Sequence, residues 1–182
     1  MRTIFLGLIG AAAVVVLALI VTPEHQVPPR LGTIAKFTPA PTQQPAPRIQ
    51  FTAADGGSKT LADFAGRALL VNFWATWCAP CVQEMPSLMR LAQRDDAHLA
   101  VIAVSEDRQG WPVMTPFLAK LGLGALPVFH DPGGSAGVAL AVSALPTTVL
   151  FGPDGREIGR FIGPAEWDGP ETAALLRRYV GG

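Results

Sequence analysis

Cysteine is scarce in this sequence, which contains only Cys78 and Cys81. Two cysteines exclude a scaffold held by several disulfides, and they exclude a four-cysteine zinc site, which needs a second pair. No charge of one sign dominates, because 14 Lys and Arg residues balance 14 Asp and Glu residues. Without a basic stripe, the chain gives no reason to expect nucleic acid as a partner. Its 182 residues suffice for one compact domain and an additional segment.

The first 22 residues carry almost no charge and are predicted to be a membrane anchor. Between Ile4 and Val21 there is no charged or strongly polar residue. As a helix this run would extend about 27 Å, close to the thickness of the hydrocarbon core of a bilayer. A cleaved signal peptide is the alternative, but the only small-x-small site, at residues 11–13, lies within the apolar run. We expect an uncleaved, single-pass signal anchor over residues 1–22, and Arg2 favours export of the domain that follows.

Residues 23–47 are rich in proline, which supplies seven of these 25 residues. Proline removes backbone donors and favours an extended conformation, so a packed core is not expected here. We interpret the segment as a linker that could reach about 75 Å at ~3.1 Å per residue. Simple disorder without a spacing role is the alternative, and composition does not separate the two. The folded domain is predicted to span residues 48–182.

The chain from residue 48 onward alternates strand-like and helix-like segments. Residues 68–74 form a nearly continuous apolar run, which is typical of a central strand buried on both faces. Residues 152–155, Gly-Pro-Asp-Gly, indicate a hairpin turn. This order predicts an α/β three-layer sandwich with a mixed central sheet and helices on both faces. The expected strands are 49–52, 68–74, 99–105, 127–130, 147–151 and 157–162, and the expected helices are 78–91, 113–120, 134–142 and 167–180.

The Cys78-x-x-Cys81 pair has three common interpretations: a structural disulfide, half of a metal site, or a redox-active dithiol. A loop of about four residues gives a crosslink worth only ~2 kcal/mol. A metal site would need two more ligands, and the three histidines form no spaced pair. The redox interpretation requires a strand that delivers the first cysteine to the start of a helix, and the sequence supplies this. There the unpaired N–H groups and the helix dipole favour the thiolate.

The spacing of the pair assigns a role to each cysteine. Cys78, at an exposed helix start, is predicted to be the attacking thiolate, and Cys81, one turn later and less exposed, to resolve the mixed disulfide. Pro80 suits the first helical turn, where its missing N–H is no loss. Trp77 is predicted to lie on an exposed rim that contacts partners, with packing in the core as the alternative. Trp74 is expected to pack beneath the site.

The residues around the pair resemble a known family. Residues 73–81, FWATWCAPC, look like a thioredoxin-family active site. The residues that follow, 82–86, make it similar to the TlpA/ResA/CcmG-like branch of membrane-anchored thiol–disulfide oxidoreductases. Residues 145–155 resemble the cis-proline loop and hairpin of that branch. Residues 104–108 and 163–168 look closest to TlpA-type members.

The resemblance implies a substrate-binding loop opposite the cysteines. Pro146 should be cis and lie against the Cys78–Cys81 pair, which would turn the backbone of Leu145 toward an incoming substrate strand. For Thr147 two interpretations stay open: a plain strand residue, or a residue that places its backbone near the sulfurs. The substrate-binding residues expected on this basis are Trp77, Pro80, Leu145, Pro146 and Thr147.

The resemblance also implies a third catalytic residue, Glu84, beside Cys78 and Cys81. Ordinary thioredoxins carry a buried aspartate in the strand before the site, and here that position is Asn72. The Cys81 proton therefore needs another acceptor. Glu84 lies three residues past Cys81 on the same helix face and is the candidate. The alternative is a surface acid at a helix start, where negative charge is favoured in any case.

By the same resemblance we expect a thiol–disulfide oxidoreductase that needs no cofactor or metal. It would be a monomeric reductase in the bacterial inner membrane, with its catalytic domain in the periplasm. Its clients would be disulfide-containing periplasmic proteins in cytochrome c or cytochrome oxidase copper-site assembly, and a membrane thiol transporter would donate its electrons. Two alternatives remain open: a periplasmic disulfide oxidase or isomerase, and a copper-binding, metallochaperone-like module.

Overall fold

The computed structural model describes residues 36–94 and 96–181. The predicted signal anchor, residues 1–22, and the first part of the predicted linker lie outside these ranges. Within them, none of the helices has both the length and the apolar character needed to cross a membrane.

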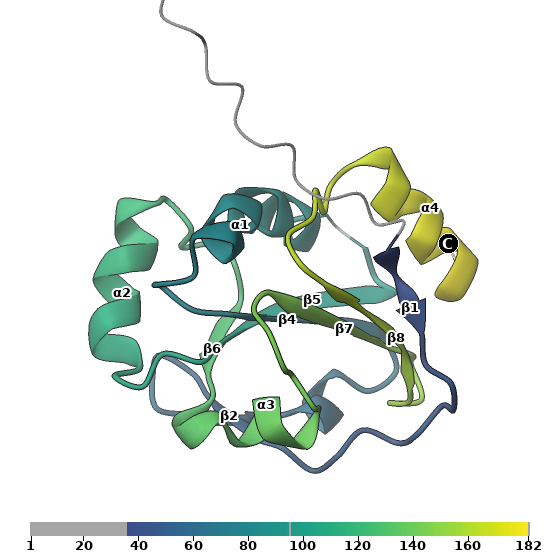
Figure 1. Ribbon diagram of the computed structural model, residues 1–182, viewed down its shortest axis with the longest axis horizontal. Coiled ribbons are helices and arrows are strands. Elements are labelled where there is room, and N and C mark those ends of the chain that lie inside the picture. Colours follow the sequence, from purple (N-terminus) through teal and green to yellow (C-terminus); the bar gives the residue numbers. More distant parts are fainter. Residues whose placement is uncertain (1–35, 95, 182) are drawn as a thin grey trace, which may run out of the picture. The chain divides into compact units, whose positions relative to one another are not determined.

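The described residues form an eight-stranded sheet in the order β1-β8-β7-β4-β5-β6-β2-β3 (Figure 1). The strands are β1 (Thr38–Pro39), β2 (Gln50–Thr52), β3 (Ser58–Thr60), β4 (Ala68–Trp74), β5 (Leu99–Ser105), β6 (Val128–His130), β7 (Thr147–Phe151) and β8 (Glu157–Ile162). The helices are α1 (Ala79–Ala92), α2 (Trp111–Lys120), α3 (Ser135–Ala139) and α4 (Pro170–Tyr179), with the 3-10 turns η2 (Leu61–Phe64) and η3 (Pro132–Gly134).

The sheet is mixed, as the sequence predicts. Strands β4, β5 and β6 run parallel, and α1 and α2 make the two crossovers between them. Parallel neighbours require such crossovers, because a tight turn can join only antiparallel strands. The pairs β4–β7, β7–β8, β1–β8, β2–β6 and β2–β3 are antiparallel.

Helices cover both faces of the sheet, which confirms the three-layer α/β sandwich. Helices α1, α2 and α4 pack on one face, and α3 with η2 packs on the other (Figure 1). Alternate residues of β4 point to opposite faces: Leu70 and Trp74 join the α1 side, whereas Leu69, Val71 and Phe73 join the α3 side. All seven residues of β4 are buried, as expected of a central strand.

The chain joins the domain before residue 48, where the sequence places the start of the folded part. Thr38 and Pro39 pair with β8, and Pro45 forms an isolated bridge with Arg156. The Phe37 ring lies 5.2 Å from the Tyr179 ring between centroids. Proline is compatible with an edge strand, where its missing N–H need not donate to the ladder. Composition alone therefore did not reveal that the end of the proline-rich segment lies along the sheet.

Two helices are shorter in the structure than predicted from the sequence. The expected helix 167–180 covers only Pro170–Tyr179. The segment 134–142 is helical only over Ser135–Ala139. Gly133 and Gly134 both have positive φ, and Ala141 has φ of 52°, so left-handed backbone interrupts the segment at both ends. The structure also adds β3, η2 and η3, which are too short to give a periodic pattern.

Candidate active site

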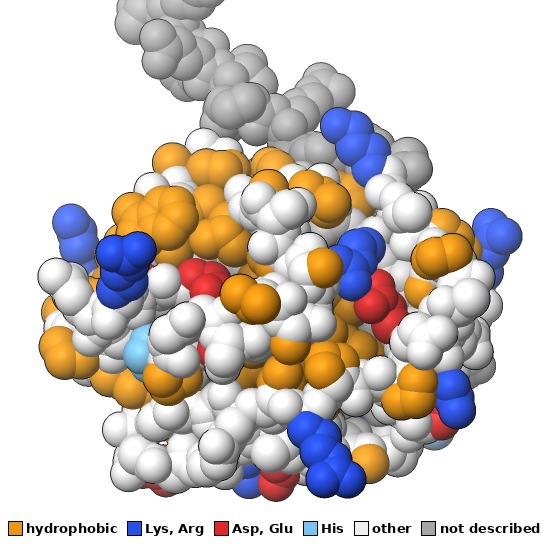
Figure 2. All heavy atoms as spheres, turned by 60° about the horizontal axis from the view of Figure 1, so that its bottom comes forward, with side chains coloured by type: hydrophobic (Ala, Val, Ile, Leu, Met, Phe, Trp, Pro, Cys, Tyr) orange, Lys and Arg blue, Asp and Glu red, His pale blue; other side chains and the backbone are white. Residues whose placement is uncertain are grey.

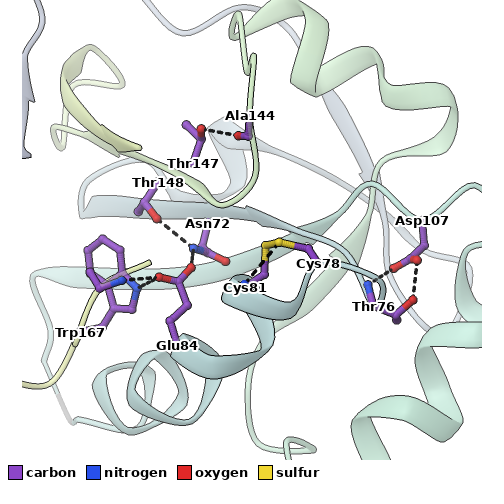
Figure 3. The surroundings of a disulfide bond; sticks show 11 residues. Asn72, Thr76, Cys78, Cys81, Glu84, Asp107, Ala144, Thr147, Thr148 and Trp167 are labelled. Atoms are coloured by element: carbon purple, nitrogen blue, oxygen red, sulfur yellow. Dashed lines mark hydrogen bonds between the residues drawn. A yellow bond between two sulfur atoms is a disulfide. The ribbon is translucent and has the colours of Figure 1, made fainter. Parts of the chain in front are cut away.

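The two cysteines lie at the start of α1, shortly after the end of β4. Cys78 is the N-cap residue of α1, and it is joined to Cys81 by a disulfide with a Cα–Cα distance of 5.3 Å (Figure 3). The Cys78 sulfur accepts a hydrogen bond of 3.3 Å from the backbone N–H of Cys81. Pro80 occupies the first turn, as predicted. Once the disulfide is reduced, the free N–H groups of this turn and the helix dipole favour a thiolate on Cys78.

The two sulfurs differ in access, although less than expected. Cys78 is 6% exposed and Cys81 is fully buried. The expectation of an exposed Cys78 is wrong in degree, because this residue belongs to the apolar cluster that contains Trp74 and Cys81. The predicted order still holds: Cys78 is the cysteine that an attacking group can reach, and Cys81 lies beneath it.

The tryptophans on either side of the turn have opposite environments. Trp77 is 69% exposed, so its ring lies on the surface beside Cys78, as predicted. Trp74 is fully buried and packs with its ring centroid 6.0 Å from that of Phe117. An exposed aromatic ring beside a reactive sulfur offers a contact for a partner chain.

The loop before β7 lies next to the end of β4. Thr147, the first residue of β7, pairs with Phe73 of β4. The Leu145–Pro146 peptide is cis, as the resemblance implies. Thr147 is buried, and its hydroxyl donates to the Ala144 carbonyl at 2.7 Å. The Pro146 carbonyl accepts from the N–H of Gly163 at 2.9 Å, which ties this loop to the chain after β8.

Glu84 is fully buried, so its interpretation as a surface acid is wrong. Asn72 Nδ2 donates to Glu84 Oε1 at 2.7 Å. The backbone N–H of Ala165 and the indole N–H of Trp167 donate to Oε2 at 2.8 Å and 2.9 Å (Figure 3). Burial raises the pKa of Glu84 to about 7, although these three hydrogen bonds act to lower it. A carboxyl group of this pKa can both take up and release a proton near neutral pH.

The partners of Glu84 come from distant parts of the chain. Asn72 lies on β4, and Ala165 and Trp167 follow β8. Sequence reasoning identified Asn72 only as the place where thioredoxins carry an aspartate, and it assigned no role to Trp167. The one available signal was the likeness of residues 163–168 to TlpA-type members.

The segment that carries Trp167 is held on α1 by residues three apart. Ser87 donates to the Glu84 carbonyl at 2.8 Å and accepts from the Trp167 backbone N–H at 3.0 Å. One turn further, Arg90 forms salt bridges with Glu166 and Asp168. Positions 84, 87 and 90 share one face of the helix. This face of α1 therefore fixes the donors that surround the buried carboxylate.

The face shown in Figure 2 has no basic patch. Its Lys and Arg side chains lie singly among apolar and uncharged ones. In residues 36–94 and 96–181, His, Cys, Asp and Glu side chains do not gather in threes as they would to hold a metal ion.

Comparisons with known proteins agree with this geometry. A family model described as Redoxin matches residues 41–176. Thiol-disulfide oxidoreductase ResA of Bacillus thuringiensis subsp. konkukian (strain 97-27) is 32% identical over 136 residues, which are 74% of this chain and 74% of that protein. Thiol:disulfide interchange protein CycY of Rhizobium leguminosarum bv. viciae is 34% identical over 106 residues, which are 58% of this chain and 55% of that protein.

Among solved structures, a Chlorobium tepidum protein proposed to be thiol:disulfide interchange protein DsbE superposes with a TM-score of 0.68 and 25% identity. The alignment covers 76% of this chain and 97% of that one. The disulfide at the start of α1 lies within the matched Redoxin region. The chain belongs to the redoxin family, as a thiol–disulfide oxidoreductase of the TlpA/ResA/CcmG-like branch of the thioredoxin superfamily.

Proposed function

We propose that the chain reduces disulfides of client proteins in the bacterial periplasm, anchored in the inner membrane by residues 1–22. The observation that supports this proposal is the arrangement of three groups at the start of α1. Cys78, at the N-cap of α1, is slightly exposed, whereas Cys81 in the first turn is fully buried. The Glu84 carboxyl group lies one turn further along the helix.

The reaction begins with the dithiol form of the chain. The Cys78 thiolate attacks one sulfur of a client disulfide, forms a Cys78–client disulfide, and displaces the other client sulfur, which takes up a proton. Cys81 then loses its proton and attacks the Cys78 sulfur. The second client sulfur leaves and is protonated, so the client gains two electrons and the chain ends as the Cys78–Cys81 disulfide.

Glu84 acts as the proton acceptor in the second step. Three donors already surround its carboxylate, so hydrogen bonds offset part of the cost of burying the ionised form when the reaction starts. With a pKa of about 7, it can take the proton that Cys81 must lose and later return it. The proton moves along one face of α1, from Cys81 toward residue 84.

Client recognition is the role of the residues around Cys78. Trp77 and Pro80 are exposed beside it, and the Leu145–Pro146 segment lies next to the end of β4. None of these side chains is charged, so a client would be recognised by apolar contacts and by its backbone.

The proposed clients and electron donor rest on the likeness to the family. We propose periplasmic proteins of cytochrome c or cytochrome oxidase copper-site assembly as clients. Because each turnover leaves the chain oxidised, a membrane thiol transporter must return two electrons to it. Relatives named ResA and CycY support the exchange chemistry.

The direction of electron flow is tested by a redox titration. The full chain is equilibrated with mixtures of reduced and oxidised glutathione, and the dithiol fraction is measured by alkylation. A reductase should remain oxidised until the mixture is more reducing than the cytosolic glutathione pool. A chain as oxidising as the glutathione couple, or more so, would be an oxidase or isomerase, and the reductase proposal would be abandoned.

A further inference from the structure

Asn72 is a polar side chain in the middle of the most buried strand. It is fully buried, and it stands between Val71 and Phe73 on β4. Because side chains alternate along a strand, Asn72 points to the same face as Leu70 and Trp74. That face packs on α1, the helix that carries Cys81 and Glu84.

The orientation of the Asn72 amide is fixed by its hydrogen bonds. Its nitrogen donates to Glu84 Oε1 at 2.7 Å and to Thr148 Oγ1 at 2.9 Å, which uses both of its hydrogens. Turning the amide over would place its oxygen against the oxygen of an ionised Glu84. When Glu84 is ionised, the amide oxygen, Oδ1, therefore faces away from both partners.

Oδ1 is a buried acceptor that no donor reaches in the part of the chain that the structure describes. In Figure 3 the Asn72 side chain lies between the Glu84 carboxylate and Cys81, with its oxygen turned to the side of the disulfide. A buried polar atom without a partner is unfavourable, and native proteins rarely keep one without a reason. In the disulfide form, the Cys81 sulfur has no hydrogen to donate.

We propose that Asn72 Oδ1 accepts a hydrogen bond from the Cys81 thiol in the dithiol form of the chain. Reduction adds two electrons and two protons to the disulfide and breaks the S–S bond, so Cys81 gains an S–H group. Reduction therefore supplies the donor that Asn72 Oδ1 lacks in the disulfide form. This inference deepens the proposed function, on which it rests for the role of the dithiol form.

The contact makes Asn72 a positioning residue. An amide oxygen does not take a proton at neutral pH, so Asn72 holds the Cys81 thiol without deprotonating it. The same amide donates to Glu84, and so a single rigid group bridges the thiol that loses a proton and the carboxylate that accepts it. Asn72 also favours the dithiol over the disulfide, because only the dithiol satisfies its oxygen.

The contact can be observed directly by infrared spectroscopy. In the Cys78→Ala variant, Cys81 carries the only thiol of the chain. Its S–H stretching band should lie below that of a cysteine thiol in water-free, non-bonding solvent, because hydrogen bonding weakens the S–H bond. The band should return toward the unbonded position in Cys78→Ala/Asn72→Leu. A band at the unbonded position in Cys78→Ala itself would overturn the proposal, even if the double variant did not fold.

The effect on redox equilibrium gives a second, independent measurement. In Asn72→Leu the oxidised form no longer buries an unpaired oxygen, so the equilibrium constant for reduction by glutathione should fall about tenfold, or about 30 mV for a two-electron couple. Thr148→Val is the matched control: it removes the other partner of the amide and should leave this equilibrium unchanged. An unchanged equilibrium in Asn72→Leu, or an equal shift in Thr148→Val, would show that Asn72 is only structural.

Glu84 must be separated from this effect, because Asn72 also contacts it. The same comparison is therefore made in the Glu84→Gln background, where a tenfold change that persists belongs to Cys81. Neither measurement uses a client protein. A chain that proved to be an oxidase would contradict the proposed function and leave both results unaffected, so the two failures are distinguishable.

Discussion

Asp107 holds Thr76 with both of its carboxylate oxygens. Thr76 Oγ1 donates to Asp107 Oδ1 at 2.7 Å, and the Thr76 backbone N–H donates to Oδ2 at 2.9 Å (Figure 3). Oδ2 also accepts from Ser105 Oγ at 2.8 Å. Asp107 follows β5 and is 4% exposed. The turn that carries Cys78 is therefore fixed from the neighbouring strand, two residues before the reactive sulfur.

Asp107→Ala should destabilise this turn. It leaves the donors of Thr76 and Ser105 without their acceptor, and we expect the free energy of unfolding to fall by about 1–3 kcal/mol. Denaturant unfolding measures the fall, and amide hydrogen exchange should accelerate at residues 75–78. Asp96→Ala is the control, because Asp96 also accepts a backbone N–H, from His98, but is exposed. Equal losses in the two variants would contradict the special role of Asp107.

Cys81→Ser should trap clients on Cys78. Without the buried sulfur the mixed disulfide cannot be resolved within the chain, so covalent adducts accumulate. They should appear on non-reducing gels of membranes and disappear on reduction, and mass spectrometry identifies the trapped proteins. Cys78→Ser should trap few or none, because Cys81 is fully buried. Equal trapping by both variants would reverse the assigned roles.

Glu84→Gln should change how stability depends on pH. The folded pKa of Glu84 is raised from 4.5 to about 7, so between these values the folded state binds more protons than the unfolded state. Stability from this group is therefore complete below pH 4.5 and is lost as pH rises through about 7, a change of roughly 3 kcal/mol.

The measurement is the free energy of unfolding of parent and variant from pH 4 to 8. The amide NH₂ of the variant faces N–H donors, which lowers stability at every pH, so the readout is the slope of stability against pH. Glu106, whose pKa burial also raises to about 7, contributes the same sign to both proteins and cancels in the difference. Parallel curves for parent and variant would contradict the burial effect on Glu84.

Trp77→Ala should slow the reduction of clients without affecting the fold. The ring is 69% exposed, so its loss should change the free energy of unfolding by less than about 0.5 kcal/mol. The second-order rate with a trapped client should fall severalfold, whereas the rate with a small disulfide should not. Leu121→Ala, an exposed apolar residue at the end of α2, serves as the control. A rate equal to that of the parent would remove Trp77 from the recognition surface.

Gly159→Ala should detach the segment before residue 40 from the sheet. A Cβ at this position would lie 2.5 Å from the Thr38 carbonyl oxygen and 2.6 Å from the Phe37 ring. We expect a loss of about 1–3 kcal/mol, as for other overpacked sites, and faster proteolysis at residues 36–47. Gly155→Ala is less suitable as a control because of its positive φ, so Ser58→Ala on the far edge strand is used. Unchanged proteolysis would mean that β1 does not depend on this contact.

Much of the sheet was predictable because buried strands have a distinctive composition. The expected bounds of residues 68–74, 99–105, 147–151 and 157–162 match β4, β5, β7 and β8. Each of these segments is an apolar or alternating run that is long enough to be recognised as a strand from the sequence. The two-residue strand β1 contains Pro39 and gave no such signal. Its pairing depends on the surface of β8, which composition does not describe.

The site was predictable where its residues are close in the sequence. The spacing of Cys78, Cys81 and Glu84 placed them on one helix, and the structure confirms that placement. The burial of Glu84 was not foreseen, because it is produced by a segment 81 residues away that brings the Ala165 N–H to its carboxylate. A local pattern cannot show which distant segment will cover a helix face.

The strands at the two edges of the described sheet are short. β1 has two residues and β3 has three, and only β2 and β6 are as short as β3 among the other described strands. An edge strand has unpaired backbone groups, to which another chain can add as a further strand. A short edge strand that contains proline offers such a chain few hydrogen bonds. In β1, Pro39 has no backbone N–H to donate to another chain. A thiol–disulfide oxidoreductase meets other polypeptide chains, and edge strands this short leave those chains little backbone along which they could extend the sheet.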